Sequence, residues 1–150
     1  MKSNQDKQMI LLDTSFLLPS LGIEVEKEVM ETLSKLVSDD TSLFYSEWSI
    51  LECSWIAIRQ IKGDNYDQSL FRRGLLSITK TEVYNLIQPD PEDYLNALTL
   101  YQKGHHDMMD NLLYTTALRK QYRFLTIDYD LSRFISKNQI ENIILTPEDI

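Results

Sequence analysis

The chain has 150 residues, of which 43% are apolar and 25% charged, a composition typical of one soluble globular domain. No apolar run approaches the ~20 residues that cross a bilayer, so we expect no membrane association. The single cysteine, Cys53, excludes an internal disulfide and a cysteine-based zinc site. The net charge of −8 argues against nucleic-acid binding through a generally basic surface. Either the acids are spread over solvated faces, or some of them are concentrated at a cation site.

The beginning of the chain is polar and lacks the apolar core of a signal peptide. We therefore expect a flexible segment over residues 1–8, one domain over residues 9–150, and a cytoplasmic location. Within the domain, short apolar runs predict strands, and apolar residues at helical spacing predict helices. In chain order we expect a strand at 9–12, a helix at 24–37, a strand at 41–45, helices at 46–62 and 66–76, a strand at 81–87, helices at 91–103 and 108–122, a strand at 124–127, a helix at 130–136 and a strand at 143–145.

The alternation of strands and helices predicts parallel βαβ units. The expected fold class is therefore α/β, a three-layer α/β/α sandwich around a mainly parallel central sheet. Apolar spacing predicts which helix faces are buried. For the helix at 46–62 we expect a buried stripe of Trp48, Leu51, Trp55 and Ile58, and for the helix at 91–103 an apolar face of Leu95, Leu98 and Tyr101.

Acidic residues fall where these elements would bring them to one edge of the sheet. Asp13 follows the strand at 9–12, and Asp128 follows the strand at 124–127. Asp110 lies in the first turn of the helix that precedes the second of these strands. Glu52 lies beside the predicted apolar stripe of its helix, where a lone carboxylate is costly to bury. Ligands of open α/β sheets bind beyond the carboxyl ends of the strands, so we expect a site there.

Clustered carboxylates indicate a particular chemistry. Mg²⁺ and Mn²⁺ are hard cations that prefer oxygen ligands, and three or four carboxylates can hold one or two of them. Such ions polarise phosphoryl oxygens and lower the pKa of bound water. Phosphodiester hydrolysis would then need no serine, cysteine or histidine nucleophile.

Four sequence blocks resemble those of PIN-domain ribonucleases, and most of all the VapC toxins of toxin–antitoxin pairs. The blocks are Leu11-Leu12-Asp13-Thr14-Ser15, Ile50-Leu51-Glu52-Cys53, the helix start Asp110-Asn111-Leu112-Leu113-Tyr114-Thr115-Thr116-Ala117, and Phe124-Leu125-Thr126-Ile127-Asp128-Tyr129-Asp130-Leu131. The resemblance extends over nearly the whole chain after residue 8. Its final block, with Thr-x-Asp at a strand end, is the most specific.

The resemblance implies a PIN-like fold and a metal-dependent endoribonuclease that hydrolyses RNA. Asp13, Glu52, Asp110 and Asp128 match the four acidic positions that would bind Mg²⁺ or Mn²⁺ and activate water. Thr126 would donate a hydrogen bond to a metal-binding carboxylate rather than bind the metal itself, and Thr14 or Ser15 would do the same for Asp13. The family also implies an antitoxin protein as partner and a homodimer.

Several neighbouring residues have other interpretations. Asp107 lies one helical turn before Asp110 and could take the third acidic position. Asp130 could join the site, although a helix N-cap is the simpler role. His105 and His106 could be metal ligands or a proton shuttle, but adjacent loop histidines are usually exposed, and we expect both to be exposed. The basic residues could contact phosphate, with Arg72 and Arg73 where an RNA-facing surface could form, but solvated faces are the simpler expectation for Arg72, Arg73, Arg119, Lys120 and Arg123. We expect Trp48, Cys53 and Trp55 to lie in the core.

Two alternatives to the enzyme remain. A non-catalytic PIN-like scaffold would keep the fold and bind protein without holding a metal. A phosphatase or receiver domain could use Asp13 as phospho-acceptor, but haloacid-type phosphatases need Asp-x-Asp where this chain has Asp13-Thr14-Ser15. The sequence shows neither the acidic pair near the start nor the late lysine that a receiver would need.

Overall fold

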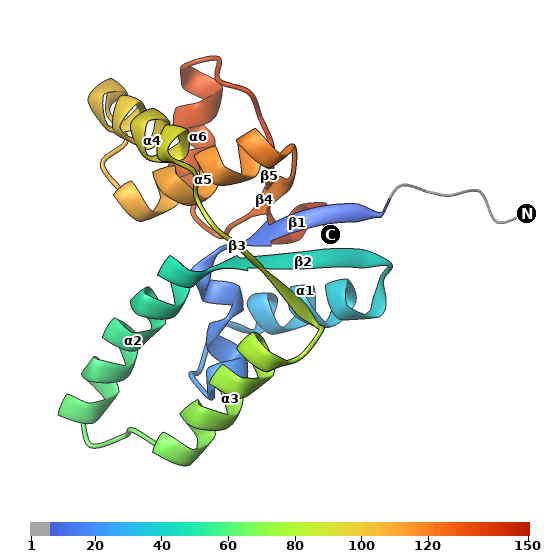
Figure 1. Cartoon of the computed structure of the whole chain (residues 1–150), viewed down its shortest axis with the longest axis vertical. Helices are drawn as coiled ribbons and strands as arrows, with labels where there is room; N and C mark the ends of the chain where they lie inside the picture. The colour runs from blue at the N-terminus through green and yellow to red at the C-terminus, as the bar shows by residue number, and fades with distance from the viewer. Residues whose placement is uncertain (1–6) are drawn as a thin grey trace, which may run out of the picture.

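A five-stranded, wholly parallel sheet forms the centre of the computed structural model, which describes residues 7–150 (Figure 1). The strand order is β3-β2-β1-β4-β5. The strands are β1 (Gln8–Leu12), β2 (Thr41–Ser46), β3 (Tyr84–Ile87), β4 (Arg123–Leu125) and β5 (Ile144–Leu145). The helices are α1 (Lys27–Ser38), α2 (Glu47–Lys62), α3 (Gln68–Lys80), α4 (Pro91–Lys103), α5 (Met108–Lys120) and α6 (Tyr129–Lys137). Residues 1–6 of the predicted N-terminal segment lie outside the described residues, and Gln8 already belongs to β1.

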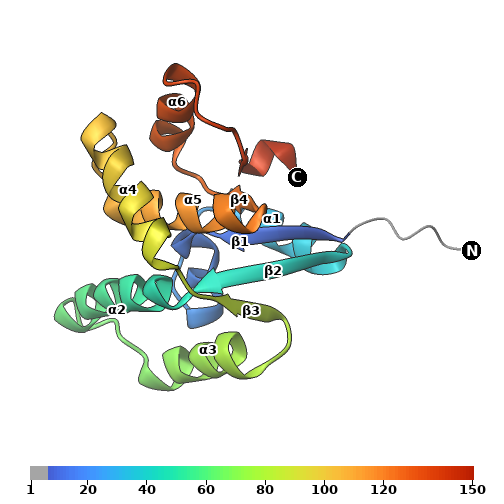
Figure 2. The ribbon, with the colours of Figure 1, turned by 45° about the horizontal axis from the view of Figure 1, so that its top comes forward.

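Helices cover both faces of the sheet, which confirms the predicted three-layer α/β/α architecture. α1, α2 and α3 pack on one face, and α4, α5 and α6 pack on the other (Figures 1 and 2). β1 serves both layers because side chains alternate along a strand. Ile10 and Leu12 join the first core and Leu11 the second, and all three are fully buried. Among residues 7–150, no helix combines the length and apolarity needed to span a bilayer.

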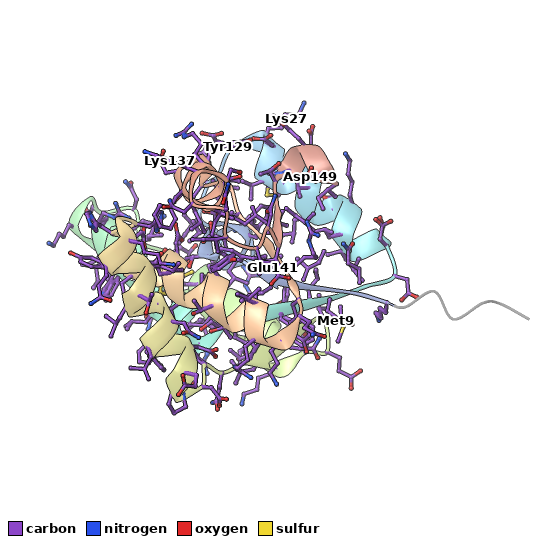
Figure 3. All side chains as sticks on the ribbon, turned by 90° about the horizontal axis from the view of Figure 1, so that it is seen from above. Met9, Lys27, Tyr129, Lys137, Glu141 and Asp149 are labelled. Carbon is purple, nitrogen blue, oxygen red and sulfur yellow. The ribbon has the colours of Figure 1, made fainter. Side chains whose placement is uncertain are left out.

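The first helix begins later than predicted because the chain first makes two short 3-10 turns, Thr14–Phe16 and Leu18–Leu21. Gly22 ends the second turn with a φ of 75°, a left-handed conformation that glycine adopts readily. At the other end of the chain, the turn that carries Asp149 lies beside α1 (Figure 3), and Lys35 Nζ donates a hydrogen bond to the Ile150 carbonyl oxygen (3.2 Å). The C-terminal turn of the domain therefore packs against α1.

The predicted buried stripes of α2 and α4 are wrong. Trp55 is 57% exposed and Leu95 is 56% exposed, and their stripe partners are exposed as well. The buried residues of α2 are Ser49, Cys53 and Ala57, and those of α4 are Asp93, Ala97 and Leu100. Small residues lie where α2 contacts the 3-10 turn Thr14–Phe16 and where α4 packs on α5, and the larger apolar side chains remain on the outside.

Arg119 is exposed, as predicted, but its guanidinium also pairs with a buried carboxylate. Asp93 is 1% exposed, and both of its carboxylate oxygens accept hydrogen bonds from Arg119 Nε at 2.9 Å. Asp93 also accepts a hydrogen bond from the Asp90 backbone N–H (2.8 Å), which closes the first turn of α4. This ion pair joins α4 to α5.

Replacing Arg119 by Met should lower the free energy of unfolding by about 2–3 kcal/mol, because Asp93 would stay buried without its cation. Lys120→Met is the matched control: it removes the neighbouring exposed cation and should change stability by less than about 0.5 kcal/mol. Urea unfolding of both variants measures the difference. Equal stabilities would show that the Asp93–Arg119 pair does not hold α4 against α5.

Candidate metal centre

The register of the sheet brings Asp13 and Thr126 side by side. Leu12 of β1 pairs with Leu125 of β4, so both strands end together at the carboxyl edge of the sheet. The Asp13 backbone N–H donates to the Leu125 carbonyl oxygen (2.9 Å), and Thr126 Oγ1 donates to Asp13 Oδ2 (3.2 Å). The Asp128 backbone N–H donates to the same Thr126 hydroxyl oxygen at 2.9 Å. One threonine hydroxyl thus links two of the predicted acidic positions.

Three helix starts supply the other acidic side chains. Ser46, the predicted N-cap, accepts a hydrogen bond from the Trp48 backbone N–H (3.2 Å) and starts α2 directly after β2, with Glu52 in its second turn. Asp110 lies in the first turn of α5. Asp128 is the N-cap of α6, where Oδ1 accepts a hydrogen bond from the Asp130 backbone N–H (2.8 Å). Helix N-termini stabilise negative charge, which favours carboxylates at these positions.

The pKa values show that these carboxylates share one buried environment. Burial, together with the nearby charges of Glu52 and Asp128, raises the pKa of Asp13 to about 7. The Thr14 backbone N–H and the Thr126 hydroxyl oppose this rise. Burial also raises the pKa of Glu52; the Thr14 hydroxyl opposes this rise, and the charge of Asp107 adds a smaller contribution to it.

Asp110 and Asp128 share a proton. Burial, followed by its hydrogen bond to Asp128, raises the pKa of Asp110 far above the usual range of an aspartate. The protonated Asp110 carboxyl donates this hydrogen bond, which holds the pKa of Asp128 below its usual range. Two carboxylates this close do not both ionise unless a cation joins them. Among residues 7–150, no lysine or arginine forms an ion pair with Asp13, Glu52, Asp110 or Asp128.

The four predicted acids therefore converge at one edge of the sheet, and the other candidates fall around them. Asp107 caps α5 by accepting a hydrogen bond from the Asp110 backbone N–H (3.1 Å), and its own side chain is exposed. Asp130 turns outward to pair with Arg133. The prediction that Asp130 is the N-cap of this helix is wrong, because Asp128 is the N-cap. Ser15 is half-buried and forms no side-chain hydrogen bond within the described part of the chain.

The prediction for His105 is wrong. His105 is 8% exposed, and one of its ring nitrogens lies within 4.8 Å of carboxylate oxygens of both Asp110 and Asp128. Its partner is Asn111, a fully buried amide one residue after Asp110. A buried amide needs hydrogen-bond partners, and this requirement is the only sequence signal that could have indicated a buried His105. His106, in contrast, is exposed as predicted.

Comparison with known proteins identifies the fold. No family model matches the sequence, and no curated protein matches it. Among solved structures, a toxin–antitoxin complex from Klebsiella pneumoniae matches with a TM-score of 0.62 and 15% identity, covering 94% of this chain and 99% of that one. VapC20 from Mycobacterium tuberculosis, a toxin that cleaves the sarcin–ricin loop, matches with a TM-score of 0.63 and 16% identity, covering 83% and 93%. The chain has the VapC-like PIN fold.

A third match agrees with this assignment. VapBC2 from Rickettsia felis, bound to a DNA fragment from its promoter, matches with a TM-score of 0.62 and 16% identity, covering 93% of this chain and 98% of that one. The nearly complete coverage of both chains means that the PIN fold accounts for the whole described domain. At this level of identity the matches establish the fold, and function has to be argued from the site.

The raised pKa of Asp13 predicts how stability depends on pH without metal. The folded state keeps a proton on Asp13 that the unfolded chain releases, so stability should fall as the pH rises from about 4 to about 7. Asp13→Asn removes this loss and should raise the metal-free Tm at pH 8 by about 5 °C. Glu31→Gln, on the exposed surface of α1, should keep the parent's profile. A lower Tm for Asp13→Asn at pH 8 would contradict the assigned burial cost.

Proposed function

We propose that the protein is a metal-dependent endoribonuclease that hydrolyses RNA phosphodiester bonds, and that it is the toxin of a toxin–antitoxin pair. The observation that carries this proposal is the convergence of Asp13, Glu52, Asp110 and Asp128 at the carboxyl edge of the sheet. Their mutual repulsion destabilises the metal-free protein. A bound cation would relieve this repulsion, so a metal site explains why the carboxylates lie together.

The residues fit a hard divalent cation. Three buried or half-buried aspartates and one glutamate offer only oxygen ligands of the kind that Mg²⁺ and Mn²⁺ prefer. When bound, the metal would polarise the scissile phosphate and lower the pKa of a water molecule. Asp13, Asp110 and Asp128 would hold it, and Glu52, on the opposite side from α5, would complete the set. Thr126 would keep Asp13 oriented through its 3.2 Å hydrogen bond.

The proposed substrate class comes from the fold and the charge. VapC20, which shares the fold, cleaves the sarcin–ricin loop, and this supports RNA as the substrate. The acidic chain would approach RNA through its metal rather than through a basic surface, because a bound cation reverses the local field. Arg72 and Arg73 on α3 are exposed and free to contact phosphate. An RNA target would also place the protein in the cytoplasm.

Metal binding and RNA cleavage should depend on the same carboxylates. Mn²⁺ at about a hundred times its Kd should stabilise the protein by ~2.7 kcal/mol, which for this length is a rise in Tm of about 5–10 °C. Asp13→Asn and Asp110→Asn should each abolish the rise and reduce cleavage of a structured RNA at least about 100-fold. Differential scanning fluorimetry and a gel-based cleavage assay measure the two effects.

Glu31→Gln is the control for charge alone and should retain both the Mn²⁺ response and the cleavage. Cleavage by Asp13→Asn at the parent's rate would refute the enzyme. A parent that shows neither the Mn²⁺ response nor cleavage would favour the non-catalytic scaffold, because that alternative keeps the fold and lacks the metal. The phospho-acceptor alternative predicts that the parent, but not Asp13→Asn, takes up label from a phosphate donor.

An exposed apolar surface on α2 and α4 supports the proposed protein partner. On α2 it comprises Trp48, Leu51, Trp55 and Ile58, and on α4 it comprises Leu95, Leu98 and Tyr101. The two helices are joined at their first turns, where Trp48 Nε1 donates to the Tyr94 hydroxyl oxygen (2.8 Å), and both extend to the same side of the molecule (Figures 1 and 2). Apolar surface of this extent marks protein interfaces. The toxin–antitoxin complexes that share the fold support an antitoxin as the occupant.

Replacing Trp55 by Glu should weaken binding of the antitoxin at least about tenfold, because large exposed aromatic residues supply most of the energy of such interfaces. The test uses the product of the adjacent upstream gene, co-expressed and measured by isothermal titration calorimetry. Val37→Glu, at an equally exposed apolar position on α1, is the matched control and should bind normally. If Trp55→Glu instead converts a dimer into a monomer and leaves antitoxin binding unchanged, this surface belongs to the homodimer.

A further inference from the structure

His105 is held rigidly at the beginning of α5 by a single side chain. Its Nδ1 lies 2.7 Å from Asn111 Oδ1, and Asn111 Nδ2 donates to the His105 carbonyl oxygen at 2.8 Å. The imidazole also packs on Phe134 of α6, with a distance of 5.3 Å between ring centroids. Both ends of the histidine, backbone and ring, are therefore fixed by Asn111.

The hydrogen bonds of Asn111 determine which ring nitrogen carries the proton. Asn111 Nδ2 faces two backbone carbonyl oxygens, those of His105 (2.8 Å) and Ala97 (3.4 Å), and carbonyl oxygens only accept hydrogen bonds. The amide oxygen must therefore face the imidazole, and Nδ1 must be the donor. In the neutral ring this leaves Nε2 unprotonated, with its lone pair available.

The imidazole of His105 borders the acidic cluster. A ring nitrogen of His105 and one carboxylate oxygen each of Asp110 and Asp128 lie within 4.8 Å of one another. Since Nδ1 is engaged by Asn111, the nitrogen available to a ligand is Nε2, which forms no hydrogen bond within residues 7–150. A buried imidazole with one nitrogen clamped and the other free is the arrangement of metal-binding histidines, whose second nitrogen donates to a fixed acceptor.

We propose that His105 Nε2 is a nitrogen ligand of the divalent metal ion that Asp110 and Asp128 bind. The inference rests on the proposed function in that it places the imidazole at the same carboxylate site. It differs in adding a softer ligand to an otherwise all-oxygen set. Asn111 is then a positioning residue, which fixes the tautomer and the direction of the ring.

A nitrogen ligand changes which ions the site prefers. Imidazole suits later divalent transition metals such as Co²⁺, Ni²⁺ and Zn²⁺, whereas Mg²⁺ and Mn²⁺ prefer oxygen ligands. The site should therefore bind Co²⁺, Ni²⁺ and Zn²⁺ more tightly than an all-carboxylate site does, with little change for Mg²⁺. If His105 only fills space under α6, its replacement would weaken all of these ions equally or none of them.

The direct test is pulsed electron paramagnetic resonance of bound Mn²⁺, which detects the coupling of an imidazole nitrogen. The protein must carry no histidine tag. Because the chain contains only two histidines, His106→Gln leaves His105 as the sole imidazole. We expect the nitrogen coupling in the parent and unchanged coupling in His106→Gln. Absence of the coupling from Mn²⁺-loaded His106→Gln would overturn the proposal, and this result does not depend on whether any His105 variant folds.

His105→Gln should lose the nitrogen coupling and weaken Co²⁺ binding at least about tenfold, with a change of less than about threefold for Mg²⁺. Asn111→Ala, which frees the ring but leaves the carboxylates in place, should weaken Co²⁺ binding by a smaller factor. Equal losses for Co²⁺ and Mg²⁺ in His105→Gln would show a structural role only.

These readouts separate the two proposals. Nitrogen coupling without RNA cleavage would support the ligand and refute the ribonuclease. RNA cleavage without nitrogen coupling would support the ribonuclease and refute the ligand. Failure of the parent to bind Mn²⁺ at all would refute both.

Discussion

The constraint on which the site depends is the electrostatic cost of bringing carboxylates together away from water. Asp13 and Asp110 are both buried, and no lysine or arginine pairs with them among residues 7–150. The fold tolerates this cost because each carboxylate is placed by backbone geometry: strand ends place Asp13 and Asp128, and the first turn of α5 places Asp110. The shared proton between Asp110 and Asp128 shows where a cation would give the largest gain.

The parallel sheet explains why acids distant in sequence meet. β1 lies between β2 and β4, so the chain leaves the sheet in opposite directions on either side of β1 and opens a crevice at the carboxyl edge. Leu12 and Leu125 end in register, and the residues that follow them enter this crevice together. α2 begins directly at the end of β2, which brings Glu52 to the same place. The site is therefore a consequence of topology, and its chemistry depends on only a few side chains.

Local patterns in the sequence predict most of this arrangement. Short apolar runs followed by aspartate locate the strand ends, and Glu52 stands out because a carboxylate borders an apolar stripe. The patterns fail where a choice depends on tertiary packing. On α2 and α4, apolar spacing indicates an amphipathic helix but does not say whether the large or the small residues face the rest of the domain. On α2 the small residues Ser49, Cys53 and Ala57 are buried, and the helix contacts the 3-10 turn that follows β1.

His105 illustrates the same limit at the site itself. A histidine in a short loop between two helices is usually exposed, and nothing adjacent to it in sequence indicates burial. Its position is decided six residues later by Asn111, a buried amide whose donors are both taken by backbone carbonyl oxygens. The amide can satisfy its remaining acceptor only by ordering the imidazole, and this holds the ring beside the carboxylates of Asp110 and Asp128. A buried polar residue on a helix is thus informative about the loop that it contacts. Its side chain needs hydrogen-bond partners, and these must come from residues outside the helix.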